Sequence, residues 1–376
     1  MRGRARRPPF AARSEPPAPA TRVRRSGAVL ALPDRRQARR TGTDALGAEP
    51  LLAVEGLRVE FPRAGRIVRA ADAVSFTVGR GEVVGLVGES GCGKTATALG
   101  LVRLVPPPGR VVDGAVRLEG TEILSLSERE IRRYRGAGIA YVPQEPGAAL
   151  NPVLKVGTQI VDVIRAHRHV PRSEAWAEAV EALRRVGIPD PERRAREYPH
   201  QFSGGMKQRA LIALALAARP KVLVADEPTT ALDVTLQAGI LDLIRSLVEE
   251  GRLLGVLLVT HDLGVVAALC DRVLVMYAGR IVERAGVRDL FTDPRHPYTR
   301  ALLASVPRPE GRRGRLAAIP GQVPDLADLP PGCAFHPRCP LAQERCRERV
   351  PDLEPAGGER AVACLLAEPV GAGEGR

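Results

Sequence analysis

The amino-acid sequence predicts an α/β core that carries an antiparallel accessory sheet and a helical insertion. Short alternating apolar stretches, separated by glycine turns, fill residues 51–120 and are typical of strands. From about residue 156 to residue 186 the pattern becomes helical, with polar faces and few glycines. Alternating β and α segments return from residue 210 to about residue 285 and complete the predicted core.

The composition allows a large folded chain and argues against nucleic-acid binding. With 376 residues and 44% hydrophobic side chains, the chain is long enough for two or three domains. Residues 1–49 are rich in Arg, Pro and Ala and are predicted to be disordered. Their twelve arginines and four acidic residues contribute +8 of the net charge of +13. The rest of the chain lacks the basic and aromatic pattern of a nucleic-acid binder, so we expect no nucleic-acid partner.

The apolar segments are too short to cross a membrane. The best run, residues 210–218, has nine residues, whereas a transmembrane helix needs about twenty. The apolar run at residues 28–32 is likewise too short for a signal peptide. We therefore expect a cytosolic protein that would serve a membrane only through a partner.

Residues 88–95 form a complete G-x-x-x-x-G-K-T motif between a predicted strand, residues 82–87, and a predicted helix, residues 96–102. Glycines let backbone N–H groups turn around a phosphate chain, and the helix N-terminus adds partial positive charge. Lys94 is expected to reach the β- and γ-phosphates, and the Thr95 hydroxyl to bind Mg²⁺. The sequence therefore predicts a triphosphate site made of Gly88, Glu89, Ser90, Gly91, Cys92, Gly93, Lys94 and Thr95.

Carboxylates and other polar side chains follow three further predicted strands. Asp226 and Glu227 come directly after an apolar strand that begins at Lys221. Asp226 is placed to bind the Mg²⁺, and Glu227 to orient or deprotonate the attacking water. Gln144 ends another apolar segment and is a candidate ligand of Mg²⁺ or of a water, and His261 is a candidate contact to the γ-phosphate. Together these side chains predict hydrolysis of the triphosphate.

A serine and two glycines, Ser203, Gly204 and Gly205, precede a helix predicted to start near residue 210. Such a sequence at a helix N-terminus makes a second anion site. One P-loop and one further phosphate site on a single chain predict a nucleotide that is shared at a dimer interface.

These motifs, in this order, make residues 51 to about 285 resemble ABC-type ATPases. The resemblance implies Mg-ATP hydrolysis and assigns a role to each motif: Gly88–Thr95 as the P-loop, Gln144 as the Q-loop, Ser203–Met206 as the signature sequence, Asp226 and Glu227 as the magnesium aspartate and catalytic glutamate, Asp233 in the D-loop, and His261 as the switch histidine. Met206 and Phe202 stand where many of these ATPases have Gln and Leu, but the serine and both glycines are kept. Phe61 is the candidate for stacking on adenine and can equally be a core side chain.

A narrower resemblance concerns the ATPases of oligopeptide, dipeptide and nickel importers. It rests on Leu150-Asn151-Pro152, on His296–Leu302 and on Gly332–Pro340. It implies a peripheral subunit at the cytoplasmic face of the cell membrane that couples ATP hydrolysis to solute uptake. The implied partners are a second ATPase subunit (a copy or a paralogue), two integral membrane permease subunits and, indirectly, an extracytoplasmic solute-binding protein. A soluble ABC ATPase acting on ribosomes or DNA, and an exporter ATPase, are the alternatives.

The predicted organisation has three parts. Residues 1–49 form the disordered tail. Residues 50–300 form the ATPase domain, with a helical subdomain at about 144–218. Residues 301–376 form a small cysteine-containing extension of the importer type.

Four cysteines of the extension are the candidate ligands of a second metal centre: Cys333, Cys339, Cys346 and Cys364. Grouped thiols in a cytosolic protein favour metal binding over disulfides. The C-x2–4-C knuckle of most zinc sites is absent, and the looser spacing, with a proline after one ligand, favours a [4Fe–4S] cluster. The importer resemblance supports this, because related ATPases include members with such a cluster. Zinc, and four reduced cysteines without a ligand, stay open as alternatives.

Overall fold

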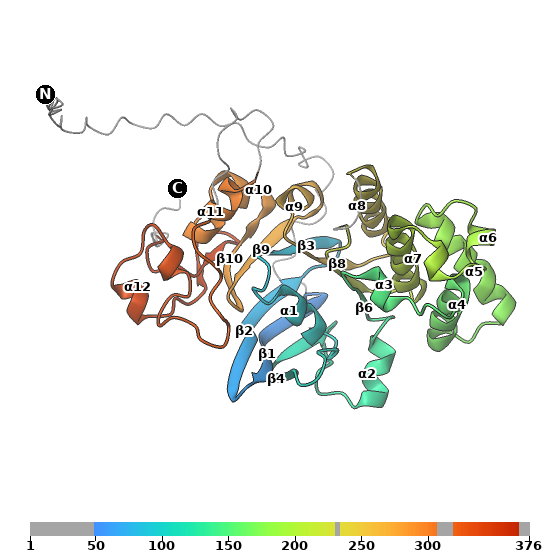
Figure 1. The fold of residues 1–376 in the computed structure, drawn as a ribbon, viewed down its shortest axis with the longest axis horizontal. Helices are drawn as coiled ribbons and strands as arrows, with labels where there is room; N and C mark the ends of the chain where they lie inside the picture. Colours follow the sequence, from blue (N-terminus) through green and yellow to red (C-terminus); the bar gives the residue numbers. More distant parts are fainter. Residues whose placement is uncertain (1–48, 230–233, 307–318, 368–376) are drawn as a thin grey trace, which may run out of the picture. The chain divides into compact units, whose positions relative to one another are not determined.

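The computed structural model describes residues 49–229, 234–306 and 319–367, and these residues form two β-sheets flanked by helices (Figure 1). The predicted disorder of residues 1–49 therefore concerns residues that, apart from Glu49, lie outside the described part of the chain. Within that part, no helix is long and apolar enough to cross a membrane.

The larger sheet has eight strands in the order β11-β12-β10-β9-β3-β8-β7-β6. Its middle strands run parallel, and the others complete one edge. Because the carboxyl ends of parallel strands meet at one edge of a sheet, the segments after β3, β7 and β8 lie together. The strands are β3 (Glu82–Val87), β6 (Ile139–Val142), β7 (Val222–Asp226), β8 (Gly255–Thr260), β9 (Arg272–Tyr277), β10 (Arg280–Gly286), β11 (Glu354–Pro355) and β12 (Ala361–Val362).

Alternating side chains of this sheet fill two separate cores. Along β3, Val83 and Val87 face one core, and Val84 and Leu86 face the other. This is the period-two pattern expected of a strand that is buried on both faces. Each parallel strand therefore reads as a nearly continuous apolar run in the sequence.

The smaller sheet is antiparallel, in the order β2-β1-β4-β5, and it covers one face of the larger sheet. Its side chains share a core with one face of β3, β7, β8 and β9. The predicted accessory sheet is thereby present; its strands are β1 (Leu52–Arg63), β2 (Arg66–Val78), β4 (Arg110–Leu118) and β5 (Thr121–Glu122).

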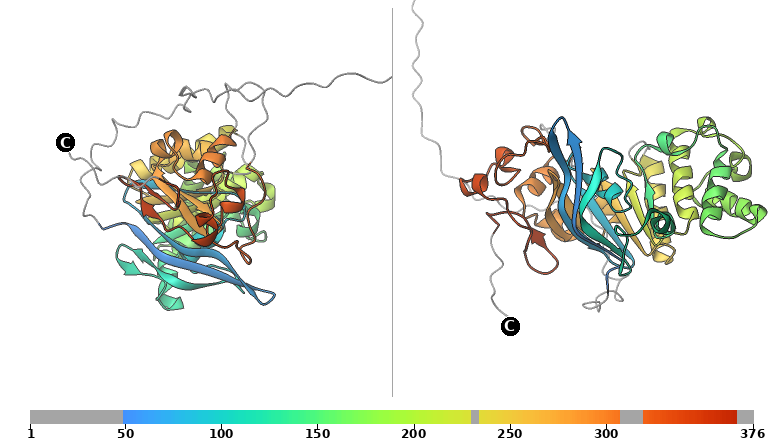
Figure 2. Two further views of the ribbon diagram at one scale, coloured as in Figure 1. Left: turned by 90° about the vertical axis from the view of Figure 1, so that its left-hand side faces the viewer. Right: turned by 90° about the horizontal axis from the view of Figure 1, so that it is seen from below.

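Helices α4 to α7 pack together, and their apolar side chains join the core that contains Val83 and Val87 of β3 (Figures 1 and 2). Helix α7 starts at Gly204, six residues before the predicted start, because the Ser203 hydroxyl caps it by accepting from the Met206 N–H. The helices are α1 (Lys94–Gly100), α2 (Glu128–Tyr134), α3 (Pro146–Ala149), α4 (Val156–His167), α5 (Arg172–Arg185), α6 (Pro191–Arg194), α7 (Gly204–Ala217), α8 (Val234–Glu249), α9 (Leu263–Leu269), α10 (Val287–Thr292), α11 (Pro297–Ala304) and α12 (Arg345–Glu348).

The extension is joined to the larger sheet rather than separate from it. Its strand β12 pairs antiparallel with β10, and Phe335 packs on Tyr277 and Tyr298 with ring centroids 5.2 and 5.4 Å apart. All three rings are at most 2% exposed. The boundary that the sequence predicts at residue 300 falls inside α11, so the division into domains stays a prediction.

Candidate nucleotide-binding site

The loop from Gly88 to Thr95 joins β3 to α1 in a form that only glycine allows at two positions. Gly93 has φ +108°, and a Cβ there would lie 1.8 Å from the carbonyl oxygen of Ala70. A Cβ on Gly88 would lie 2.3 Å from the carbonyl oxygen of Met276. The loop is therefore pressed against neighbouring backbone, which fixes its shape before any ligand arrives.

Lys94 is the first residue of α1 and is buried. Its Nζ donates to the carbonyl oxygens of Gly88 and Glu89, at 2.8 and 3.1 Å. The ammonium group is thus held over the loop it belongs to, at the place where a phosphate chain needs positive charge.

Asp226 ends β7 with a carboxylate that has one partner and one orphaned oxygen. Its Oδ2 accepts from the Tyr141 hydroxyl at 3.0 Å, whereas Oδ1 is buried without a hydrogen-bond partner among the described residues. Burial raises the pKa of Asp226, and the hydroxyls of Thr95 and Tyr141 lower it. A buried carboxylate oxygen beside a threonine hydroxyl fits Mg²⁺, which prefers hard oxygen ligands.

Glu227 lies one residue beyond the strand and is held from two sides. Its Oε2 accepts from Gln144 Nε2 at 2.7 Å, and its Oε1 lies 2.8 Å from His261 Nδ1. Its backbone has φ +48°, a left-handed conformation that costs a non-glycine residue about 1–3 kcal/mol. The fold thus brings three residues predicted from separate motifs into one hydrogen-bonded group and aims the carboxylate by a strained turn.

The signature turn is not part of this group. Ser203 is exposed, and its hydroxyl accepts from the Met206 N–H of its own helix at 3.3 Å. A Cβ on Gly204 would meet nothing within 4 Å. The turn therefore faces open space on a single chain, and among the hydrogen bonds of the described residues none joins Ser203 to the P-loop.

The predicted roles of Phe61 and Asp233 in nucleotide binding stay untested by the structure. The half-buried Phe61 ring packs on Gly109, where a Cβ would lie 2.3 Å from the ring, so its stacking on adenine stays a prediction. Asp233 lies outside the described residues.

Three residues that the sequence analysis did not single out contact the site. Tyr141 binds Asp226, as described above. The carboxylate of Glu89 receives two hydrogen bonds from Arg338, and its N–H donates to the Tyr298 hydroxyl at 2.9 Å. In the sequence, Tyr298 and Arg338 were noted only as members of the His-Pro-Tyr and Pro-Arg-Cys motifs. These motifs supported the family resemblance but assigned no role to either residue.

The four cysteines of the extension converge. Cys333, Cys339, Cys346 and Cys364 line one small cavity of about 20 Å³, together with His296 and His336. Burial raises the pKa of Cys333, and the neighbouring cysteines raise it further. The donor set suits a metal centre, yet no group of three or more His, Cys, Asp or Glu within the described ranges has metal-binding geometry. A cavity of this size holds about one water-sized body, so a cluster would need the surrounding loops to move apart.

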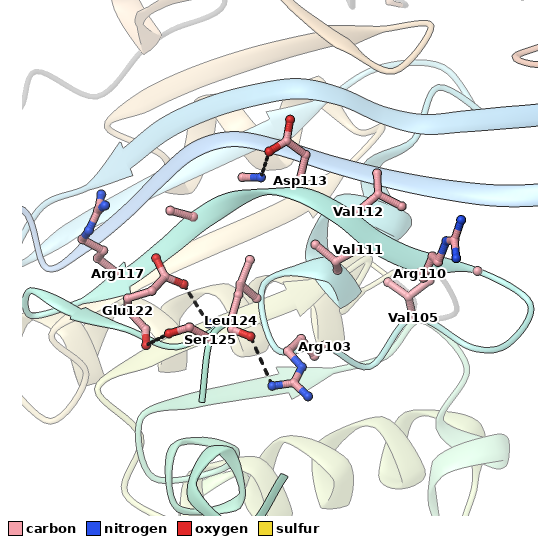
Figure 3. Close-up of a pocket in the computed structure, with 13 residues that line it drawn as sticks. Arg103, Val105, Arg110, Val111, Val112, Asp113, Arg117, Glu122, Leu124 and Ser125 are labelled. Carbon is pink, nitrogen blue, oxygen red and sulfur yellow. Dashed lines mark hydrogen bonds between the residues drawn. The ribbon is translucent and has the colours of Figure 1, made fainter. Parts of the chain in front are cut away.

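A wider groove of about 670 Å³ lies on the accessory sheet, along β4 and the segment before it (Figure 3). Arg103, Asp113, Arg117 and Glu122 are among its lining residues, and none of the predicted nucleotide-binding residues is. The candidate nucleotide site is therefore the open edge of the larger sheet and not this groove.

Comparison with known proteins places the same segments in two families. Residues 71–230 match the family model for ABC transporters, and residues 282–346 match the C-terminal region of oligopeptide/dipeptide transporters. A "Probable peptide ABC transporter ATP-binding protein" of Sinorhizobium fredii is 52% identical over 325 residues, which cover 86% of this chain and 97% of that protein. The oligopeptide transport ATP-binding protein AppD of Bacillus subtilis is 46% identical over 323 residues, covering 86% of this chain and 98% of the relative.

Among solved structures, a dimeric ATP-binding cassette in a post-hydrolysis state, bound to ADP and phosphate, matches with a TM-score of 0.57 at 28% identity. The match covers 63% of this chain and 99% of that one. The fold shared with that cassette therefore takes up only part of this chain.

Proposed function

The chain belongs to the ATP-binding proteins of ABC transporters, and on that premise we propose that it is the ATP-hydrolysing subunit of a peptide importer. The observation that carries the proposal is Glu227, held between Gln144 and His261 at the strand end beside Asp226. The relatives' names, which refer to peptide transport, give no support to a role on ribosomes or DNA, or to export.

The residues of the site divide the work of hydrolysis. Residues Gly88–Thr95 bind the phosphate chain through backbone N–H groups and Lys94. Bound Mg²⁺, held by Thr95, Asp226 and Gln144, would neutralise charge on the phosphates. Glu227 accepts the proton of the water that attacks the γ-phosphorus as the bond to ADP breaks. His261 lies beside Glu227 and is proposed to contact the γ-phosphate.

The site is half complete on one chain, which supports a second ATPase subunit, either a copy or a paralogue. The P-loop is pressed against neighbouring backbone and its Lys94 is buried, whereas the Ser203 turn is exposed with open space in front of it. Each nucleotide would lie between the P-loop of one subunit and Ser203–Met206 of the other. The dimeric state of the matching cassette, bound to ADP and phosphate, supports the same arrangement.

The segment after Gln144 is the proposed contact to two membrane permease subunits. Val153 and Leu154 are 75% and 39% exposed, which is high for apolar side chains. The buried Gln159 fixes this segment, because its Nε2 donates to the carbonyl oxygens of Asn151 and Leu154, both at 3.0 Å. Because the exposed Val153 and Leu154 are held firmly and follow Gln144 in the chain, we propose that they pass a movement of Gln144 on to the permeases. Contact with the permeases would place the chain at the cytoplasmic face of the membrane, with a solute-binding protein as an indirect partner.

The four cysteines are proposed to bind a [4Fe–4S] cluster, with zinc as the alternative. The convergence of the thiols supports a metal, and the position of Cys333, Cys339 and Cys364 outside helices and strands leaves room for the movement that a cluster requires. Metal analysis with an absorption spectrum of anaerobically purified protein decides. About four irons per chain support the cluster, one zinc supports a tetrahedral site, and no metal overturns both.

The proposed function is tested by ATP hydrolysis and by co-purification. The purified chain is expected to hydrolyse Mg-ATP, and Lys94→Ala is expected to abolish tight binding, because it removes the charge that meets the phosphates. Affinity purification of the tagged chain from membranes should recover integral membrane proteins, and the Lys94→Ala variant should recover them too. A chain that neither hydrolyses ATP nor recovers a membrane partner contradicts the proposal.

A further inference from the structure

One residue of the P-loop, Glu89, forms hydrogen bonds with groups from three segments of the chain. Its carbonyl oxygen accepts from Lys94, its N–H donates to the Tyr298 hydroxyl of α11, and its carboxylate binds Arg338 of the extension. The last contact joins residues that are 249 positions apart in the sequence. The P-loop is therefore fixed in part by residues outside the cassette.

The contact with Arg338 is a two-pronged, largely buried ion pair. The two terminal guanidinium nitrogens lie 2.7 and 3.0 Å from the two carboxylate oxygens. The Arg338 side chain is 4% exposed and that of Glu89 27%. A planar guanidinium that meets a carboxylate in this way fixes orientation as well as distance, which an ammonium group cannot do.

Arg338 is itself held on its far side. Its Nε donates to the carbonyl oxygen of Pro320 at 2.8 Å, and its guanidinium lies over the Tyr277 ring, 5.9 Å from the centroid. Tyr277 packs on Tyr298 with ring centroids 4.6 Å apart. The two groups that bind Glu89 thus share one rigid aromatic support.

We propose that Arg338 is a positioning residue of the nucleotide site, which holds the P-loop through Glu89 and makes the extension a working part of the ATPase. The inference rests on the proposed function, in which Gly88–Thr95 binds the triphosphate. The observation behind it is that a residue of the extension contacts the P-loop directly.

The test uses Arg338→Gln in the full chain, with Arg347→Gln as the matched control. Arg347 lies in the same extension, and its side chain is 61% exposed. Arg338→Gln is expected to raise the KM and the Kd for Mg-ATP by about 10-fold to 100-fold, with a smaller change in kcat, since misplacing a binding group costs of that order. The control should keep wild-type values. An Arg338→Gln variant with unchanged KM and Kd overturns the proposal.

Two further variants separate positioning from general stability. Glu89→Gln should raise KM as Arg338→Gln does, and the double variant should be no worse than either, because both remove one interaction. Additive effects on KM overturn the proposal. Should Arg338→Gln fail to fold, Glu89→Gln alone decides, since it alters the carboxylate that Arg338 binds; an unchanged KM then overturns the proposal.

Lys94→Ala in the same assay distinguishes the two proposals. Loss of ATP binding in Lys94→Ala, together with a normal Arg338→Gln, rejects only the role of Arg338. Normal binding in Lys94→Ala rejects the nucleotide site itself, and with it the premise of the inference.

Discussion

The two turns proposed to bind phosphate each precede a helix and differ in almost everything else. The P-loop is wedged between backbone segments, closed by a buried lysine and clamped at Glu89 by residues from α11 and the extension. The Ser203 turn is exposed, and its serine binds only its own helix. A turn that works within one chain can be fixed in advance, whereas a turn that serves another chain has to stay accessible until the two meet.

The largest expected effect concerns the carboxylate of Glu227, which lies at the strand end next to Asp226. Glu227→Gln removes the proton acceptor but keeps a side chain that can still contact Gln144 and His261. Turnover should fall by about 10²–10⁴-fold, typical of losing a positioned base, while ATP binding is retained. Single-turnover hydrolysis and equilibrium binding measure the two quantities. A variant that hydrolyses ATP at nearly the wild-type rate would show that another group receives the proton.

The next effect concerns the support beneath the P-loop. His296 caps α11, where its Nδ1 accepts from the Tyr298 N–H at 3.0 Å, and burial lowers its pKa to about 4. Below about pH 6.5 the unfolded chain takes up a proton that the native His296 does not. The free energy of unfolding should therefore fall as the pH drops from about 6.5 to about 4, by at most about 3 kcal/mol.

Denaturant unfolding between pH 4 and pH 7 measures this slope. His296→Asn, which offers another capping side chain, should reduce it. The exposed His200 provides the control, because His200→Asn should leave the slope unchanged. An unaltered slope in His296→Asn would assign the acid sensitivity to other groups.

The smallest expected effect concerns the exposed turn at Ser203. Ser203→Ala should leave ATP binding by the isolated chain unchanged, because the serine is proposed to bind the nucleotide of the partner subunit. ATP-dependent dimerisation should weaken by about tenfold, the equivalent of about one hydrogen bond to a charged group. Analytical ultracentrifugation with Mg-ATP, in the Glu227→Gln background that slows hydrolysis, measures it. If Ser203→Ala weakens binding by the isolated chain as much as Lys94→Ala does, the contrast between the two turns is wrong.

Most of the cassette could be predicted because its signals are local. The apolar run before Gly88 and the run before Asp226 are each buried on both faces, so their sequence alone indicates central strands. The meeting of Gln144, Glu227 and His261 was predictable in outline, since their strands are parallel and end at one edge. The hydrogen bonds between them, and the strained φ of Glu227, depend on side-chain packing that no local pattern encodes.

The sequence by itself therefore determined the α/β cassette fold and the order of the motifs, and it predicted which residues form the nucleotide site. These follow from residue types at short spacings, where backbone geometry and glycine content act locally. Only the tertiary structure decided that the extension reaches the P-loop, through the contact of Arg338 with Glu89. The physical reason is that a contact between residues hundreds of positions apart is set by the packing of whole elements. The sequence around Glu89 gives no indication of Arg338, and the sequence around Arg338 gives none of Glu89.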